Sequence, residues 1–202
     1  MTDEIAVSSI GGGPASRRSE SDFYPTPWEA TFALMDFLRL PRCSLIWEPA
    51  CGEGDMVETI RRCGYCVVGT DIVMGYDFIN NPPPKDHGFS VNGAPAQIDF
   101  IITNPPFSAS EDFIRHALDL NVPFAFLLKS QYWHAARRLN LFEQNPPTFV
   151  LPLTWRPDFL FKQHSEKRAS PLMDVMWCVW MKDDAPAIYK PLKKPNHLEV
   201  WK

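Results

Sequence analysis

The stretch Trp47-Glu48-Pro49-Ala50-Cys51-Gly52-Glu53-Gly54-Asp55 continues a short apolar run that begins at residue 44, and a helical pattern follows it over residues 56–63. Glycines in a strand-to-helix turn let the backbone approach a ligand closely. The N-terminus of the helix that follows offers free N–H groups to an anion such as a carboxylate. The stretch therefore predicts a ligand-binding turn between a strand and a helix.

The segments around this turn alternate between strand-like and helix-like patterns. We expect helices over residues 28–40, 56–63 and 109–120, where apolar residues recur at helical spacing. Short apolar runs predict strands over residues 44–47, 66–69, 98–103, 123–128, 148–153 and 175–181. Strands that alternate with helices favour a parallel α/β sheet, in which ligands bind at the carboxyl ends of the strands.

An acidic residue closes the second predicted strand. Asp71 lies 23 residues after Glu48 and is followed by Ile72. A carboxylate at this position can accept hydrogen bonds from both hydroxyls of a ribose. A nicotinamide-dependent dehydrogenase would show G-x-G-x-x-G, but position 57 is Val. The run resembles instead the E-P-x-x-G-x-G loop of Rossmann-like methyltransferases.

The composition is that of an ordinary globular domain. The 202 residues are 45% apolar and 22% charged, and no apolar run approaches the roughly 20 residues of a membrane helix. Residues 1–21 are rich in Ser and Gly and lack the layout of a signal peptide, so they predict a flexible tail before a single domain of residues 22–202. We therefore expect a cytoplasmic protein with no membrane partner.

Cysteines and net charge narrow the classes of function further. Five cysteines without a signal peptide argue against a disulfide framework. Cys63 and Cys66 have C-x2-C spacing, but no second pair stands at suitable spacing, so we expect no metal site. The net charge of −4 means that nucleic-acid binding would need a local basic patch rather than bulk charge.

The run Asn104-Pro105-Pro106-Phe107 directly follows the predicted strand at residues 98–103. Two prolines remove two backbone donors, and each restricts the residue before it to extended geometry. The loop therefore displays carbonyl oxygens and few N–H groups. The Asn104 side-chain oxygen and the Pro105 carbonyl can accept the two hydrogens of a conjugated amino group, while Phe107 can stack on a base. We expect these four residues to form a catalytic centre that holds such a nitrogen for methylation.

Together these features resemble the N6-adenine DNA methyltransferases, in particular their small phage and prophage Dam-like type. The similarity covers about residues 22–107 and adds two pieces, the run Asp22-Phe23-Tyr24-Pro25-Thr26-Pro27 and the pair Asp77-Phe78. It implies S-adenosyl-L-methionine as cofactor, adenine N6 in DNA as acceptor, and a bacterium or phage-infected cell as setting. The cofactor-binding residues that it implies are Tyr24, Pro25, Thr26, Pro27, Glu48, Pro49, Ala50, Gly52, Gly54, Asp71, Ile72, Asp77, Phe78 and Asn104.

The resemblance also implies a fold and a domain organisation. The order of the motifs belongs to enzymes whose cofactor half is N-terminal. The implied fold is a Rossmann-like, seven-stranded, mostly parallel sheet with helices on both faces and a C-terminal antiparallel hairpin, for which residues 148–153 and 175–181 are the candidates. Fewer than 100 residues follow Phe107, and most of them are needed to complete the sheet, so we expect a single domain without a separate target-recognition domain. The chain is expected to be a monomer or a homodimer.

Two segments combine basic and aromatic residues, which suit phosphate contact and base stacking. The first, residues 129–138, follows a predicted strand and so lies on the ligand side of the sheet; the second is residues 155–170. We assign no acid–base role to His134 or His164, because the mechanism does not demand a histidine. The residues expected to contact nucleic acid are Tyr132, Trp133, Arg137, Arg138, Arg156, Lys162, Lys167 and Arg168.

Other functions fit the same motifs. Asn-Pro-Pro-(Tyr/Phe) runs also serve enzymes that act on RNA bases or on a protein glutamine amide, because all present a planar, conjugated nitrogen. The Tyr24-Pro25-Thr26-Pro27 run favours DNA by resemblance, and N4-cytosine methylation is disfavoured because that group more often has Ser at position 104. A non-catalytic S-adenosylmethionine-binding interaction protein would show a damaged catalytic run, whereas residues 104–107 are complete.

Overall fold

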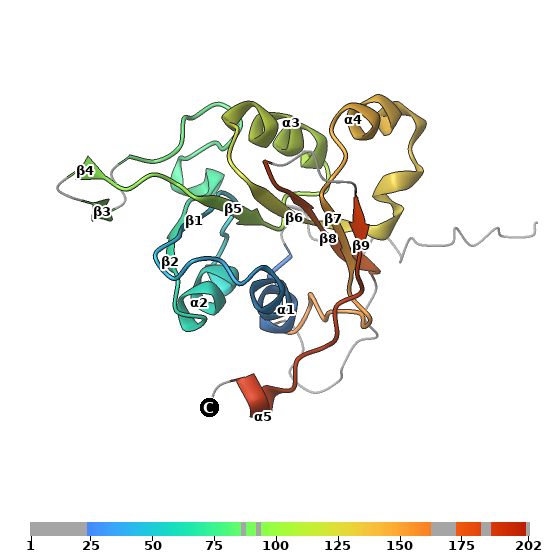
Figure 1. Ribbon diagram of the computed structural model, residues 1–202, viewed down its shortest axis with the longest axis horizontal. Helices are drawn as coiled ribbons and strands as arrows, with labels where there is room; N and C mark the ends of the chain where they lie inside the picture. The colour runs from blue at the N-terminus through green and yellow to red at the C-terminus, as the bar shows by residue number, and fades with distance from the viewer. Residues whose placement is uncertain (1–23, 86–87, 92–93, 163–172, 183–186, 201–202) are drawn as a thin grey trace, which may run out of the picture.

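The computed structural model describes residues 24–85, 88–91, 94–162, 173–182 and 187–200. The predicted tail, residues 1–21, lies outside them. A seven-stranded sheet forms the centre, in the order β2-β1-β5-β6-β8-β7-β9 (Figure 1). Its strands are β1 (Leu45–Glu48), β2 (Cys66–Gly69), β5 (Phe100–Thr103), β6 (Phe124–Lys129), β7 (Phe149–Pro152), β8 (Val175–Trp180) and β9 (Ile188–Tyr189).

The sheet is mostly parallel. β2, β1, β5 and β6 pair in parallel, β8 runs antiparallel between β6 and β7, and β9 pairs in parallel with β7. The predicted fold class is thus confirmed, with β7 and β8 as the C-terminal antiparallel hairpin. Three short strands were not predicted: β9, and the separate two-stranded sheet of β3 (Ser90–Val91) and β4 (Ala94–Pro95).

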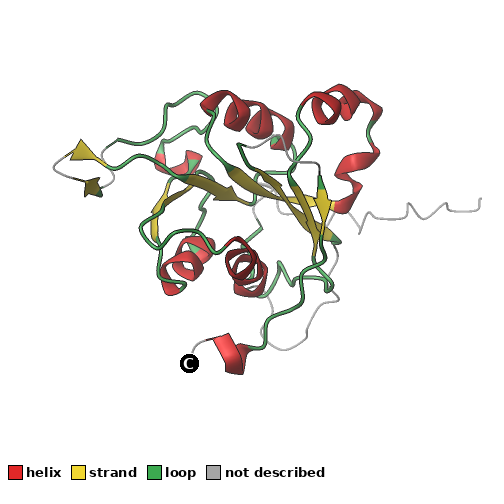
Figure 2. Cartoon of the chain, viewed as in Figure 1, coloured by secondary structure: helices red, strands yellow, loops and turns green. Residues whose placement is uncertain are grey.

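Helices cover both faces of the sheet, as predicted. Helices α1 (Trp28–Leu38) and α2 (Asp55–Arg62) lie on one face, and α3 (Ser110–Leu120) and α4 (Leu139–Gln144) lie on the other (Figures 1 and 2). The short α5 (His197–Val200) ends the described chain beside α1 and α2. Among the described helices, none has the length and apolar character that crossing a membrane requires.

Two buried clusters hold these layers together, one on each face of the sheet. Along β5 the side chains alternate: Phe100 and Ile102 join the cluster with α1 and α2, whereas Ile101 joins the cluster with α3. This alternation follows from the two-residue period of a strand. Each such side chain, buried completely, stabilises the fold by about 1.5–3 kcal/mol. The Trp177 indole N–H on β8 also donates to the Ala30 carbonyl at 2.9 Å, which ties α1 to the sheet.

The parallel strands place four chain segments at one edge. β1, β2, β5 and β6 all end there, so the residues that follow Glu48, Gly69, Thr103 and Lys129 meet at their carboxyl ends. This edge carries the loop at residues 48–54, here called the glycine loop, together with Asp71 and the run at residues 104–107. The fold therefore brings the sequence motifs to one place.

Candidate active site

A cavity of about 530 Å³ lies at the carboxyl ends of β1, β2 and β5. Every residue that the sequence predicted to bind the cofactor lines it, except Pro27 and Gly54. Those two lie just outside, as the N-cap residues of α1 and α2. The predicted residues that line the cavity are Tyr24, Pro25, Thr26, Glu48, Pro49, Ala50, Gly52, Asp71, Ile72, Asp77, Phe78 and Asn104, together with Pro105, Pro106 and Phe107.

The glycine loop closes tightly between β1 and α2. Gly52 and Gly54 have φ values of 50° and 89°, the left-handed region that favours glycine. The Gly54 N–H donates to the Cys51 carbonyl at 2.8 Å, and the Cys51 N–H donates to the Thr70 carbonyl at 3.0 Å. The loop is thereby fixed against the end of β2, and α2 begins directly after it.

Val57 occupies the position where a dinucleotide fingerprint has its third glycine. The space that α2 needs in order to pack closely on the sheet is left instead by Gly69. A Cβ atom at Gly69 would lie 2.9 Å from Val57 Cγ2 and 3.1 Å from Cys51 Cβ. The close approach of α2 to the sheet therefore depends on a glycine in β2 rather than in the helix. The sequence pattern alone did not reveal this exchange.

Asp71 stabilises the turn that it borders. Its Oδ2 accepts the Gly52 N–H at 2.8 Å and its Oδ1 accepts the Val73 N–H at 3.0 Å. Each carboxylate oxygen keeps a further lone pair, so a ligand hydroxyl can still donate to it. Ile72 follows with 69% of its surface exposed and forms part of the cavity wall. An acid beside an exposed apolar side chain suits a ribose with an attached base.

Glu48 is a buried acid in the cavity wall. Its side chain is 3% exposed, and among the described residues its Oε2 has no hydrogen-bond partner. Burial, with smaller contributions from the nearby charges of Asp55 and Asp71, raises its pKa well above 4.5. A cationic amine that entered the cavity would give this oxygen its missing partner and favour the ionised carboxylate.

Asp77 and Phe78 form the far wall of the cavity. The Asp77 carboxylate accepts hydrogen bonds from the Asn80 side-chain amide at 2.7 Å and from the Ile79 N–H at 2.9 Å. These bonds lower its pKa, so it remains an acceptor for an amino group. Phe78 is buried, with its ring 5.1 Å from that of Trp47 and 4.7 Å from that of Phe113.

Asn104 is held by both hydrogens of its amide. Its Nδ2 donates to the Tyr24 carbonyl at 3.2 Å and to Thr26 Oγ1 at 3.1 Å. A carbonyl oxygen can only accept, so these contacts fix which side of the amide carries the oxygen. Asn104 Oδ1 is buried and has no hydrogen-bond partner among the described residues. The side chain is therefore a fixed acceptor with an unmet hydrogen bond.

The rest of the run is anchored to α3. The Pro106 carbonyl accepts the Ala109 N–H and the Ser110 hydroxyl, both at 3.0 Å. Phe107 is half-buried, and its ring centroid lies 5.4 Å from that of Tyr24. The structure thus presents a rigid loop with an amide oxygen and an aromatic ring on one wall of the cavity.

The first predicted nucleic-acid segment packs largely against its own protein. Tyr132 is buried with its hydroxyl facing no partner among the described residues, and Arg138 lies 3.8 Å over its ring. Trp133 is half-buried, 4.2 Å from the Phe142 ring, and its indole N–H donates to Met176 Sδ. The rings of Tyr132 and Trp133 therefore anchor α4. Arg137 is the most exposed of the four, with 74% of its side chain accessible.

The second predicted segment is described only to residue 162. Arg156 is exposed and pairs with Asp174, with N–O distances of 2.7 and 3.3 Å. Lys162 Nζ contacts Glu53 Oε2 at 2.8 Å and Asp55 Oδ2 at 2.7 Å, which connects this segment to the glycine loop. Lys167, Arg168 and His164 lie outside the described residues.

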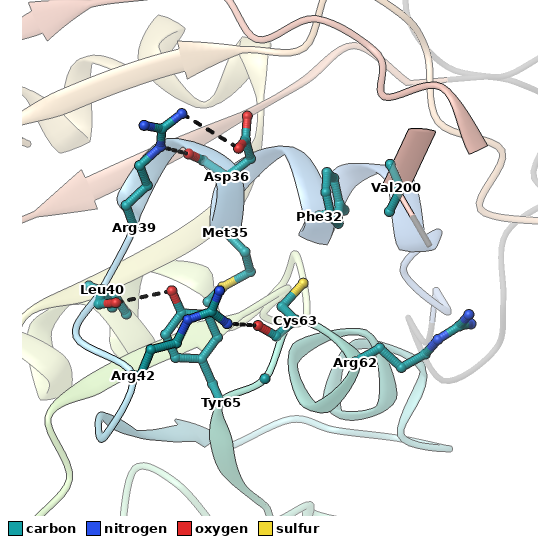
Figure 3. A pocket seen from close by; sticks show the side chains of 11 residues that line it. Phe32, Met35, Asp36, Arg39, Leu40, Arg42, Arg62, Cys63, Tyr65 and Val200 are labelled. Carbon is teal, nitrogen blue, oxygen red and sulfur yellow. Dashed lines mark hydrogen bonds and ion pairs between the residues drawn. The ribbon is translucent and has the colours of Figure 1, made fainter. Parts of the chain in front are cut away.

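A second cavity, of about 570 Å³, lies at the amino-terminal edge of the strands (Figure 3). Arg39 Nε donates to the Asp36 carbonyl at 3.1 Å, and Arg42 Nη1 donates to the Cys63 carbonyl at 2.6 Å. These carbonyls stand at the C-terminal ends of α1 and α2, where helices leave oxygens without partners. Helix capping explains why both arginines lie here, so their positions do not indicate a ligand-binding site. No group of metal-ligating side chains occurs among the described residues.

Comparisons with known proteins give matches in structure only. No protein-family model and no curated protein sequence matches the chain. A structure from Listeria monocytogenes, assigned as a class I S-adenosylmethionine-dependent methyltransferase, aligns with a TM-score of 0.55 at 13% identity over 88% of this chain and 68% of its own. One from Pyrococcus horikoshii, assigned as an RNA methyltransferase, aligns with a TM-score of 0.54 at 12% identity over 79% of this chain and 88% of its own. The chain has the Rossmann-like methyltransferase fold.

Proposed function

We propose that this chain is an S-adenosylmethionine-dependent methyltransferase that methylates the N6 amino group of adenine in DNA. The observation that carries the proposal is Asn104. Both its amide hydrogens are committed to the segment at residues 24–26, and its oxygen is left as an acceptor beside a cavity of about 530 Å³. A plain loop after a strand has no need of such a constrained, unsatisfied acceptor.

The cavity lining fits S-adenosylmethionine. Asp71 would accept from the ribose hydroxyls, Asp77 from the adenine amino group, and Glu48 from the ammonium of the methionine part. The unsatisfied Oε2 of Glu48 supports this fit, because a buried acid is stabilised by a cation. When bound, the cofactor supplies an electrophilic methyl group on a sulfonium. Tyr24, Pro25 and Thr26 would close the methionine end of the cavity.

Asn104 and Pro105 would prepare the acceptor nitrogen. The lone pair of an exocyclic amino group is delocalised into its ring, which makes the nitrogen a poor nucleophile. The Asn104 Oδ1 and the Pro105 carbonyl accept its two hydrogens and favour a localised lone pair. Held in this way, the nitrogen would accept the methyl group that the bound cofactor supplies, and its surplus proton would be released to water. Positioning and preorganised acceptors carry the rate enhancement.

Phe107 favours a nucleic-acid base over other acceptors. Its half-buried ring provides a stacking surface beside the amide acceptor, and a glutamine side chain has no aromatic plane to stack. A base in a duplex must leave the stack to reach this site. The preference for DNA over RNA rests on the resemblance of residues 22–27, so RNA methylation is the alternative.

The test incubates the full chain with S-adenosylmethionine labelled in its methyl group and with DNA, RNA or a protein extract in separate reactions. Digestion and mass spectrometry identify the modified nucleoside. We expect N6-methyladenine in the DNA reaction. A methylated RNA base or glutamine with unmodified DNA would contradict the DNA assignment, and cofactor binding with no methylated product in any reaction would favour the non-catalytic alternative.

A further inference from the structure

Lys162 bridges two acids in the wall of the cavity. Its Nζ lies 2.8 Å from Glu53 Oε2 and 2.7 Å from Asp55 Oδ2. Both acids line the cavity of about 530 Å³, whereas Lys162 is not among the lining residues. With one positive and two negative charges, the three groups together have a net charge of −1. The lysine therefore acts on the cavity through the two acids that it contacts.

The segment that carries Lys162 is itself anchored beside the cavity. Phe159 is buried, and its ring centroid lies 6.3 Å from that of Tyr24, a residue of the cavity wall. The ion pairs are partly exposed, because 36% of the Lys162 side chain and 65% of the Glu53 side chain are accessible. Ion pairs of this kind add little to stability. Stabilisation of the fold is therefore a weak reason for the bridge.

The bridge lies close to the acid that the proposed function assigns to the ammonium of the cofactor. The Val57 backbone, in the first turn of α2, makes a hydrogen bond to the Glu48 carboxylate, and the charge of Asp55 at the start of this helix also acts on Glu48. In S-adenosylmethionine the ammonium and the carboxylate are bonded to one carbon atom. An ammonium held by Glu48 would therefore bring the carboxylate of the cofactor to the first turn of α2, where Asp55 lies.

Two acids without a cation would repel the carboxylate of the cofactor, and the repulsion grows where water is partly excluded. We propose that Lys162 is a positioning residue of the cofactor site, which balances the charges of Glu53 and Asp55 so that the cavity admits this carboxylate. The inference rests on the proposed function and names the residue that makes room for the acidic group of the cofactor. It gives Lys162 a role in cofactor binding, whereas the composition of its segment indicated contact with nucleic acid.

The experiment measures the affinity of the full chain for two ligands by calorimetric titration. The ligands are S-adenosylmethionine and decarboxylated S-adenosylmethionine, which keeps the sulfonium and the amino group but lacks the carboxylate. The first variant, Lys162→Met, removes the positive charge. The second combines Glu53→Gln with Lys162→Met, so the net charge of the group returns to −1 without the bridge. Lys190→Met is the matched control, because Lys190 is exposed and does not line the cavity.

A charge-balancing role predicts different effects on the two ligands. We expect Lys162→Met to bind S-adenosylmethionine about three- to tenfold more weakly than the wild type, because the uncompensated acids repel its carboxylate. The same variant should bind the decarboxylated ligand at least as tightly as the wild type, since that ligand carries only positive charges. The double variant should recover the wild-type affinity for S-adenosylmethionine, and Lys190→Met should match the wild type with both ligands.

A purely structural bridge predicts another result. If Lys162→Met weakened both ligands equally and the double variant recovered neither, the lysine would only hold the glycine loop in place, and the inference would be overturned. Wild-type affinity of Lys162→Met for S-adenosylmethionine would overturn it too. Because binding is measured without methyl transfer, a missing methylated product contradicts only the proposed function. A wild-type chain that bound neither ligand would contradict both.

Discussion

Glu48 places a carboxylate where burial disfavours its charge. Burial raises its pKa above the unfolded value near 4.5, so the folded protein holds the proton more tightly than the unfolded chain. The stability contributed by this proton is present below about pH 4.5 and is lost as the pH rises through the folded-state pKa. The wild type should therefore be less stable at neutral pH than a variant with an uncharged side chain at this position.

We expect Glu48→Gln to raise the melting temperature of the cofactor-free protein by a few degrees at neutral pH, since ~1 kcal/mol corresponds to about 2–4 °C in a domain of this size. The gain should shrink as the pH falls toward 4.5. The same variant should bind S-adenosylmethionine about 10- to 100-fold more weakly, because a charge-assisted hydrogen bond is lost. Thermal unfolding and calorimetric titration measure the two effects.

Glu58→Gln is the control for both measurements, because Glu58 is exposed on α2 and does not line the cavity. It should change neither the melting temperature nor the cofactor affinity appreciably. A Glu48→Gln variant with the same pH dependence of stability as the wild type would show that this carboxyl group does not titrate differently in the folded protein. An unchanged affinity for S-adenosylmethionine would show that Glu48 does not bind the cofactor.

At the scale of elements, the contact between α2 and β2 depends on a small residue. Gly69→Ala would place its Cβ 2.9 Å from Val57 Cγ2, so we expect a loss of about 1–3 kcal/mol in the free energy of unfolding. Val57→Ala removes the obstructing atom, so the double variant should lose less than the sum of the two single variants. Denaturant unfolding of all four chains measures the coupling. Strict additivity would contradict the steric explanation.

The elements with a clear apolar pattern could be predicted, and the others could not. β5 and β8 are apolar along nearly their whole length, because neighbouring strands and helices bury them on both faces. β9 has only two residues, Ile188 and Tyr189, both exposed, and pairs through its backbone. α4 spans six residues, too few for a periodic pattern to stand out.

At the scale of the whole molecule, the motifs of the candidate site could be predicted because each follows a strand whose carboxyl end lies at one edge. The contacts between segments that lie far apart in the sequence could not be predicted. Asn104 reaches Thr26 across 78 positions, and Lys162 reaches Glu53 across 109. The packing of Tyr132 and Trp133 against α4 is also a tertiary contact that the sequence does not reveal. The composition of residues 129–138 predicted only that these rings could stack on a base.

The proposed function assigns the acceptor nitrogen to Asn104, and the rate of methyl transfer by Asn104→Ala tests that proposal most directly. Asn140→Ala, an exposed change on α4, is the control. Loss of a preorganised acceptor predicts a rate about 100- to 1000-fold lower than that of the wild type, with a much smaller change in cofactor affinity. A variant that transferred methyl groups at the wild-type rate would contradict the assignment of Asn104 as the group that holds the acceptor nitrogen.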